Sequence, residues 1–314
     1  MTAPATVPDP LPRPMHTESS HQLTRRDYIL LTLLILSWGL NWPVMKMSVR
    51  EFPPLTFRSL SMVGGLVVIA LAARMQHASM RVPPGKALTV IKLAVPNMLI
   101  WHTFIILGVK LLSSGRAAIL GYTMPVWAVL SGLAFFGDRI AGRALLGILL
   151  AMAGAGLLLS SEFAAISGQP LGTVFALIAA AAWGLGTVLM KRTRLEMPTI
   201  SLTFWMLALT TVVMLGLSLL LERSQWRMPN MIEWIGIVYN AAIIFGFAHV
   251  VWFRLARLLP PVVSSLSVMF IPVVGTFSGA WLLGETPQWQ DYLAMLLILG
   301  SMSTVLFQPR ARDQ

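Results

Sequence analysis

Apolar residues fill this chain in long runs, and short polar gaps separate the runs. A helix that crosses a bilayer needs about 20 mostly apolar residues. By that criterion the pattern predicts an all-α integral membrane protein with ten transmembrane helices and short loops. The predicted spans are 29–47, 54–73, 87–108, 116–136, 142–160, 172–190, 199–221, 232–253, 262–283 and 289–307.

The segments outside the spans are too short to hold a soluble catalytic domain, since the loops average under about ten residues. Residues 1–27 are rich in Pro, Ser and Thr at their start, which predicts a disordered cytoplasmic tail without the apolar core of a signal peptide. Residues 308–314 form a second predicted tail. Between the tails, 28–160 and 171–307 each hold five predicted spans.

These two halves carry the same motifs in the same order. Trp38-Gly39-Leu40 in the first span recurs 145 residues later as Trp183-Gly184-Leu185 in the sixth. The pattern from Met124-Pro125 to Gly137-Asp138 recurs 147 residues later, from Ile271-Pro272 to Gly284-Glu285. Because each half has an odd number of spans, the second half would enter the membrane upside down. Such an inverted repeat is typical of transporters, whose substrate site lies near the midplane between the halves.

The five-plus-five duplication and these motifs resemble the drug/metabolite transporter superfamily in its EamA-type branch, over residues 28–307. Within that branch the chain is similar to bacterial amino-acid exporters of the kind that move aromatic amino acids and methyl viologen. The resemblance implies export of small metabolites without fixing which one. One departure is that Arg58 follows Pro53-Pro54, whereas the matching stretch after Pro198 has Thr203 and Phe204.

Composition agrees with a membrane protein, because 56% of the residues are hydrophobic and only 11% are charged. The absence of cysteine excludes disulfides and cysteine-ligated metals. The net charge of +11 is dispersed over the polar gaps and forms no basic face, so nucleic acid is not an expected partner.

The basic residues indicate the topology. With both termini in the cytoplasm, 16 Lys and Arg lie on inner segments and 7 on outer ones, which follows the positive-inside rule. We therefore expect a multi-pass protein of the bacterial inner membrane with cytoplasmic N- and C-termini. The outer set is Lys46, Arg50, Arg58, Lys110, Arg116, Arg223 and Arg227.

Acidic residues avoid the predicted span interiors, so no carboxylate is available for proton coupling in mid-membrane. His102 and His249, at matching repeat positions, are the protonatable groups that remain at depth. Each is either a proton-responsive group or a neutral residue bonded to a neighbouring helix. Transport is accordingly either uniport or coupled through one of these histidines.

Other polar and aromatic residues in the spans are candidates for a substrate cavity. Asn41 lies close to Pro43, which removes a backbone donor; the pair predicts either a polar binding spot or a structural kink with an interhelical bond. Tryptophans inside spans either line a pocket or pack against helices and lipid. The candidate cavity residues are Trp38, Asn41, Trp101, His102, Tyr122, Trp183, Trp205, Tyr239, Asn240 and His249.

The predicted cavity is thus nearly neutral and aromatic. It favours a secondary transporter that exports amino acids or similar metabolites by alternating access. A multidrug or organic-cation exporter would need an anionic group in the cavity, and a lipid-modifying membrane enzyme would need clustered Asp, His or Arg at one face. No phosphate-binding loop or zinc-protease motif occurs, so neither enzymatic activity nor a cofactor or metal is expected. The expected partners are a small-molecule substrate and the lipid bilayer, with a monomer as one option for the oligomeric state.

Overall fold

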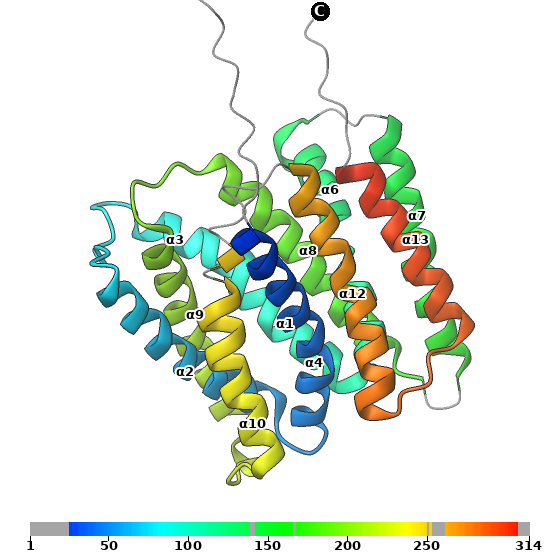
Figure 1. Ribbon diagram of the computed structural model, residues 1–314, viewed down its shortest axis with the longest axis horizontal. Helices are drawn as coiled ribbons and strands as arrows, with labels where there is room; N and C mark the ends of the chain where they lie inside the picture. Colours follow the sequence, from blue (N-terminus) through cyan, green and yellow to red (C-terminus); the bar gives the residue numbers. More distant parts are fainter. Residues whose placement is uncertain (1–24, 139–141, 166–167, 250, 253–260, 307–314) are drawn as a thin grey trace, which may run out of the picture.

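The computed structural model describes residues 25–138, 142–165, 168–249, 251–252 and 261–306 as a bundle of helices (Figure 1). The part of the chain that it describes contains no β-strand. The elements are α1 (Arg25–Val49), α2 (Pro54–Met75), α3 (Ala87–Ala94), η1 (Val95–Ile100), α4 (Trp101–Leu111), α5 (Ser114–Gly121), α6 (Met124–Phe136), α7 (Gly142–Ala164), α8 (Pro170–Arg192), α9 (Thr199–Leu221), η2 (Arg223–Gln225), α10 (Met231–Tyr239), η3 (Asn240–Ala248), α12 (Pro261–Leu283) and α13 (Trp289–Leu306).

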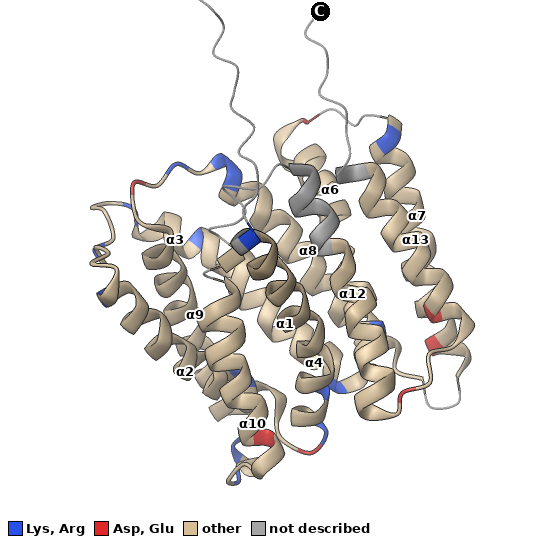
Figure 2. Ribbon diagram, viewed as in Figure 1, with Lys and Arg blue, Asp and Glu red and all other residues tan. Residues whose placement is uncertain are grey.

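The all-helical, multi-pass architecture predicted from hydropathy is confirmed. Eight helical segments among the described residues are long and apolar enough to cross a membrane, and Met269–Leu283 is a shorter apolar helix. The ten-span inverted repeat stays a prediction. In Figure 2 the charged residues lie almost entirely at the two ends of the helices, with an uncharged band between them. This distribution is the one that a hydrocarbon environment requires.

Helices α1, α4, α8 and α12 occupy the centre of the bundle (Figure 1). Helices α2 and α9 pack together on one flank, and α7 and α13 pack together on the other. In the centre, α1 packs on α12 while α8 packs on α4 and α6. The central helices are therefore the ones whose side chains can face an internal cavity.

Two π-helical segments interrupt the central helices at corresponding places. η1 joins α3 to α4 just before His102, and η3 follows α10 just before His249. Within each segment an asparagine side chain donates to the carbonyl four residues earlier: Asn97 to Leu93 at 2.9 Å and Asn240 to Gly236 at 3.1 Å. These bonds satisfy carbonyls in lipid where no water is at hand. Single π turns inside α-helices are common at functional sites.

Two glycines allow the central helices to approach closely. A Cβ added at Gly39 of α1 would lie 2.4 Å from Val274 Cγ1 of α12, and one at Gly184 of α8 would lie 2.6 Å from Ala128 N of α6. The first contact is with a side chain, whereas the second is with the backbone. Small residues at such contacts let helix backbones come together in membranes.

The sequence motifs that end in Gly137 and Gly284 adopt one geometry. Both glycines have positive φ, 67° and 64°, directly after α6 and α12. The next residue's N–H donates back to a helix carbonyl, Asp138 to Gly132 at 3.1 Å and Glu285 to Gly279 at 3.4 Å. This is the αL termination for which glycine is favoured.

Gly184→Ala and Gly39→Ala are each expected to destabilise the protein relative to wild type. A methyl at 184 would press on Ala128 N and, at 2.8 Å, on Met124 O, so α6 itself would have to shift. A methyl at 39 would lie 2.4 Å from Val274 Cγ1 and 2.6 Å from Val274 Cβ; rotation of the valine side chain does not move its Cβ, so α1 and α12 would have to move apart. Overpacking of this kind costs about 1–3 kcal/mol. Thermal unfolding of the detergent-solubilised variants, followed by circular dichroism, measures the difference.

The matched control is Gly156→Ala in α7, since a Cβ there meets nothing within 4 Å. Its Tm should stay at the wild-type value. A Gly184→Ala variant that melts together with the Gly156→Ala control would contradict the close α8–α6 contact.

Candidate functional site

A small cavity of ≈ 80 Å³ lies between the central helices. Seven of the ten candidate residues line it: Trp38, Asn41, Trp101, His102, Tyr122, Trp183 and His249. Sequence reasoning missed six further lining residues: Trp42, Met45, Arg58, Ile105, Met124 and Ile244. The lining comes from α1, α2, α4, the C-cap of α5, α6, α8, and η3 with its C-cap, so residues far apart in sequence are brought together.

Aromatic rings form much of the cavity wall. Trp101 and Trp183 have ring centroids 5.0 Å apart, and Trp38 meets His249 edge-on at 6.0 Å. Phe245 lies between the two histidines, 5.3 Å from His102 and 5.6 Å from His249. Such pairs prefer tilted or edge-on arrangements, which fix ring positions without filling the space completely. The wall can therefore accept an apolar or aromatic group.

Several polar atoms in this wall have no hydrogen-bond partner among the described residues. They include Asn41 Oδ1 and both ring nitrogens of His102. Asn41 is only 8% exposed and His102 only 3%. His249, in contrast, has its Nδ1 2.7 Å from Ile244 O. Buried polar groups are normally paired, so unpaired ones that line a cavity are candidate ligand contacts. Their role in substrate binding stays a prediction.

Arg58 is the most important residue that sequence reasoning missed. It was counted with the outer, topology-setting charges, but its side chain lines the cavity and only 1% of the residue is exposed. The prediction of a nearly neutral cavity is therefore wrong in this respect. The signal was present, since position 58 lies inside the span 54–73. Its place near the start of that span made it look like a residue that reaches back to the interface.

Three candidate residues lie outside the cavity wall. Trp205 lies on α9, on the flank of the bundle away from the centre, and is therefore 36% exposed. Its indole N–H donates to Met80 O at 2.7 Å. The Tyr239 hydroxyl donates to Ser37 O at 2.7 Å and ties α10 to α1. Asn240 is buried behind the wall, where its Oδ1 accepts from Arg58 Nη1 at 3.2 Å. These placements correct the expectation that all three line the cavity.

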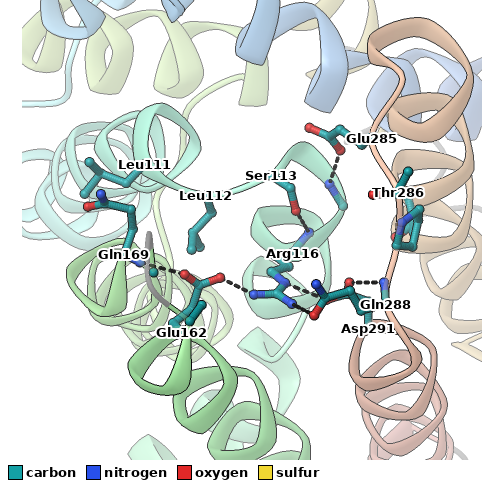
Figure 3. A pocket seen from close by; sticks show the side chains of 15 residues that line it. Leu111, Leu112, Ser113, Arg116, Glu162, Gln169, Glu285, Thr286, Gln288 and Asp291 are labelled. Atoms are coloured by element: carbon teal, nitrogen blue, oxygen red, sulfur yellow. Dashed lines mark hydrogen bonds and ion pairs between the residues drawn. The ribbon is translucent and has the colours of Figure 1, made fainter.

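A second, polar cavity of ≈ 330 Å³ lies near one end of the bundle, between α4, α5, α7, α12 and α13 (Figure 3). At its centre Arg116 of α5 pairs with Glu162 of α7 and, at 2.6 Å, with Asp291 of α13. Glu285 follows α12 and accepts from Ser114 N at 2.8 Å and Ser114 Oγ at 2.7 Å. Its negative charge is well placed at the N-terminus of α5. This cluster links four helices through charges that satisfy one another, so it is better suited to structure than to ligand binding.

The helical bundle, its uncharged band and its central cavity define a polytopic membrane protein of the solute-transporting kind. Comparison with known proteins makes this specific: the EamA-like transporter family matches residues 26–160 and 170–307. The chain therefore belongs to this family of the drug/metabolite transporter superfamily, as the sequence motifs indicated.

Proteins of similar sequence are named as transporters or efflux pumps. The uncharacterized transporter YoaV of Bacillus subtilis is 25% identical over 271 residues, which cover 85% of this chain and 90% of that protein. A probable amino-acid metabolite efflux pump of Escherichia coli is 26% identical over 306 residues, covering 92% and 98%. A solved crystal structure with 22% identity matches 91% of this chain and 99% of that one at a TM-score of 0.65, which shows a shared fold.

Arg116→Ala is expected to lower the Tm by several degrees. It would leave Glu162 and Asp291 as buried carboxylates without their cation, and breaking a buried ion pair from one side costs roughly 3–5 kcal/mol. Fluorescence-detected unfolding in detergent measures the loss. The triple variant Arg116→Ala/Glu162→Gln/Asp291→Asn removes the stranded charges and should regain part of the stability. Wild-type stability in the single variant would contradict the structural role of the cluster.

Proposed function

We propose that this protein is a secondary transporter that exports amino acids or similar small metabolites across the bacterial inner membrane. The central cavity between the helices of the two halves carries the proposal. It is lined by aromatic and polar side chains and lies between spans. Its ≈ 80 Å³ is below the roughly 300–1,000 Å³ of drug-sized ligand pockets, so it suits a small solute and a state that is contracted around the site.

Alternating access of a five-plus-five inverted repeat is the proposed mechanism. In its support, Gly39 packs on Val274 in one half-to-half contact and Gly184 packs on Trp127 in the other; a Cβ added at Gly39 would lie 2.4 Å from Val274, and one added at Gly184 would lie 2.7 Å from Trp127. Val274 and Trp127 are 147 residues apart, the same offset that relates the two Gly-acid motifs. Equivalent contacts in the two halves would let either end open in turn.

The proposed orientation puts both termini in the cytoplasm. The bias of 16 inner to 7 outer basic residues supports it, and removing the buried Arg58 from the outer group strengthens the bias. One similar protein, from Escherichia coli, is named an inner membrane transporter. The amino-acid substrate class is supported by the efflux-pump relative and by the cavity lining.

An organic-cation exporter of the same fold is the alternative, and the cavity argues against it. Such a substrate needs an anionic group, or aromatic rings with no positive charge beside them. The residues that line the cavity include no Asp or Glu, and the one fixed charge, Arg58, is positive. A lipid-modifying enzyme is disfavoured by the family and by the position of the site between the helices.

Proteoliposomes that contain the purified protein and labelled amino acids are expected to release at least one amino acid faster than protein-free liposomes. An imposed pH gradient separates uniport from coupling through His102 or His249. No accelerated release of any amino acid would contradict the proposed substrate class.

Trp183→Ala should slow this release by about tenfold, which corresponds to ~1.4 kcal/mol of lost transition-state stabilisation. The indole forms part of the cavity wall with Trp101, so its loss removes contact area and loosens its partner. Trp205→Phe is the matched control and should keep the wild-type rate, because Trp205 lies on the flank. Equal rates for both variants, at equal yields of folded protein, would contradict the assignment of the cavity as the transport site.

A further inference from the structure

Arg58 is a buried cation without a counterion among the described residues. Its Nη1 donates to Asn240 Oδ1 at 3.2 Å, its Nη2 to Met45 Sδ at 2.8 Å, and its Nε has no partner. Every arginine that does form an ion pair in the described chain, namely Arg116, Arg192 and Arg227, has a carboxylate within 2.6 Å. Both partners of Arg58 are neutral, so they orient the guanidinium and leave its charge uncompensated.

Burial of such a charge is unfavourable. Guanidinium groups stay protonated, and an unpaired buried charge costs several kcal/mol even after the surroundings relax. No carboxylate in the described part of the chain forms an ion pair with Arg58. Glu222, which contacts the start of the same helix, accepts from Leu55 N at 3.0 Å and Thr56 N at 2.7 Å, so it is engaged there. An anionic group from outside the chain is therefore the natural partner.

The rest of the cavity limits what that anion can be. The planar guanidinium fork matches a carboxylate or a phosphate. The cavity offers one cation, and its other side chains are mainly indole, phenol and aliphatic groups. It therefore suits a carboxylate, with one negative charge, better than a phosphate, with two. The same wall presents Asn41 Oδ1, an acceptor with no partner among the described residues. An acceptor of this kind can receive a hydrogen bond from an ammonium group.

We infer that Arg58 binds the carboxylate of the exported solute and that Asn41 receives a hydrogen bond from its α-ammonium group. The aromatic wall then contacts an apolar side chain. The substrates are accordingly zwitterionic α-amino acids with apolar side chains, and the carboxylate is obligatory. This inference rests on the proposed export function and adds the residue that selects the substrate class.

The test compares amino acids with analogues that lack one charged group. The probes are leucine, methionine and phenylalanine, their decarboxylated amines isopentylamine, 3-(methylthio)propylamine and phenethylamine, and the amine-free acid 3-phenylpropionate. A ligand that binds the folded state raises the Tm. With wild-type protein, at least one amino acid should raise the Tm and inhibit release of a labelled amino acid. Its amine should need at least about tenfold more ligand, equal to ~1.4 kcal/mol.

Arg58→Met and Arg58→Lys distinguish ligand binding from a structural role. Arg58→Met removes an uncompensated charge, so the ligand-free Tm should stay the same or rise, while the preference for the amino acid over its amine disappears. Arg58→Lys keeps the charge but loses the fork, and should retain an intermediate preference. Arg116→Gln is the matched control, because its arginine has carboxylate partners: the Tm should fall and the preference should remain.

The possible outcomes separate the two proposals. If no amino acid is released or bound by the wild-type protein, the export function itself fails. If amino acids are released but the wild-type protein treats every amino acid that it binds and the corresponding amine alike, only the role of Arg58 fails. That role also fails if Arg58→Met lowers the ligand-free Tm and keeps the preference. The comparison within the wild-type protein remains decisive even where Arg58→Met does not fold.

Discussion

A hydrocarbon environment has no water to pair with a charge or with an open backbone group, and this constraint governs the arrangement of polar groups in the protein. Almost all charged residues lie at the helix ends, as Figure 2 shows, and Arg58 is the exception. There they form hydrogen bonds with the backbone N–H and C=O groups at helix ends that have no partner within the helix. Lys110 Nζ, for example, donates to Val49 O at 2.5 Å and Arg50 O at 2.7 Å at the end of α1, while Glu222 and Glu285 accept from the first N–H groups of α2 and α5.

Under this constraint the polar atoms of the central cavity form a distinct class. The carboxylates at the helix ends are engaged by backbone and by Arg116, so they contribute to rigidity and have little capacity left for a solute. Arg58, Asn41 and His102 instead retain unpaired atoms at depth. Their cost is tolerable only if a ligand or solvent pairs with them during part of the working cycle. The π segments next to the cavity fit this picture, because Asn97 and Asn240 keep the backbone satisfied there.

Much of the fold could be predicted because hydropathy acts over whole spans. The predicted 199–221 coincides with α9, and the predicted 54–73 ends two residues before α2 does. Seven candidate residues line the central cavity. They were chosen as polar or aromatic side chains inside spans, and the repeat related four of them in pairs; their part in substrate binding stays a prediction. The helix face was harder to predict. Spans that are apolar all round carry no amphipathic stripe, so hydropathy did not distinguish Trp205 on the flank from Trp101 in the wall; only Trp38 and Trp183 were marked out, by the repeat. Arg58 was missed for a related reason: only tertiary packing decides whether a cation near the start of a span reaches the surface or the interior.

The repeat supplies a nearly symmetric framework, but its charge is asymmetric. Gly39 and Gly184 allow equivalent close contacts, and Trp38 and Trp183 reach the same cavity from the two halves. Arg58 has no counterpart: the corresponding stretch of α9 has Thr203, whose hydroxyl donates to Thr199 O at 2.9 Å within its own helix. In the transport cycle that we propose, the paired framework would let either side open, while the single cation would hold the carboxylate of the solute on the α2 side throughout. Symmetry would then serve the movement and asymmetry the choice of substrate.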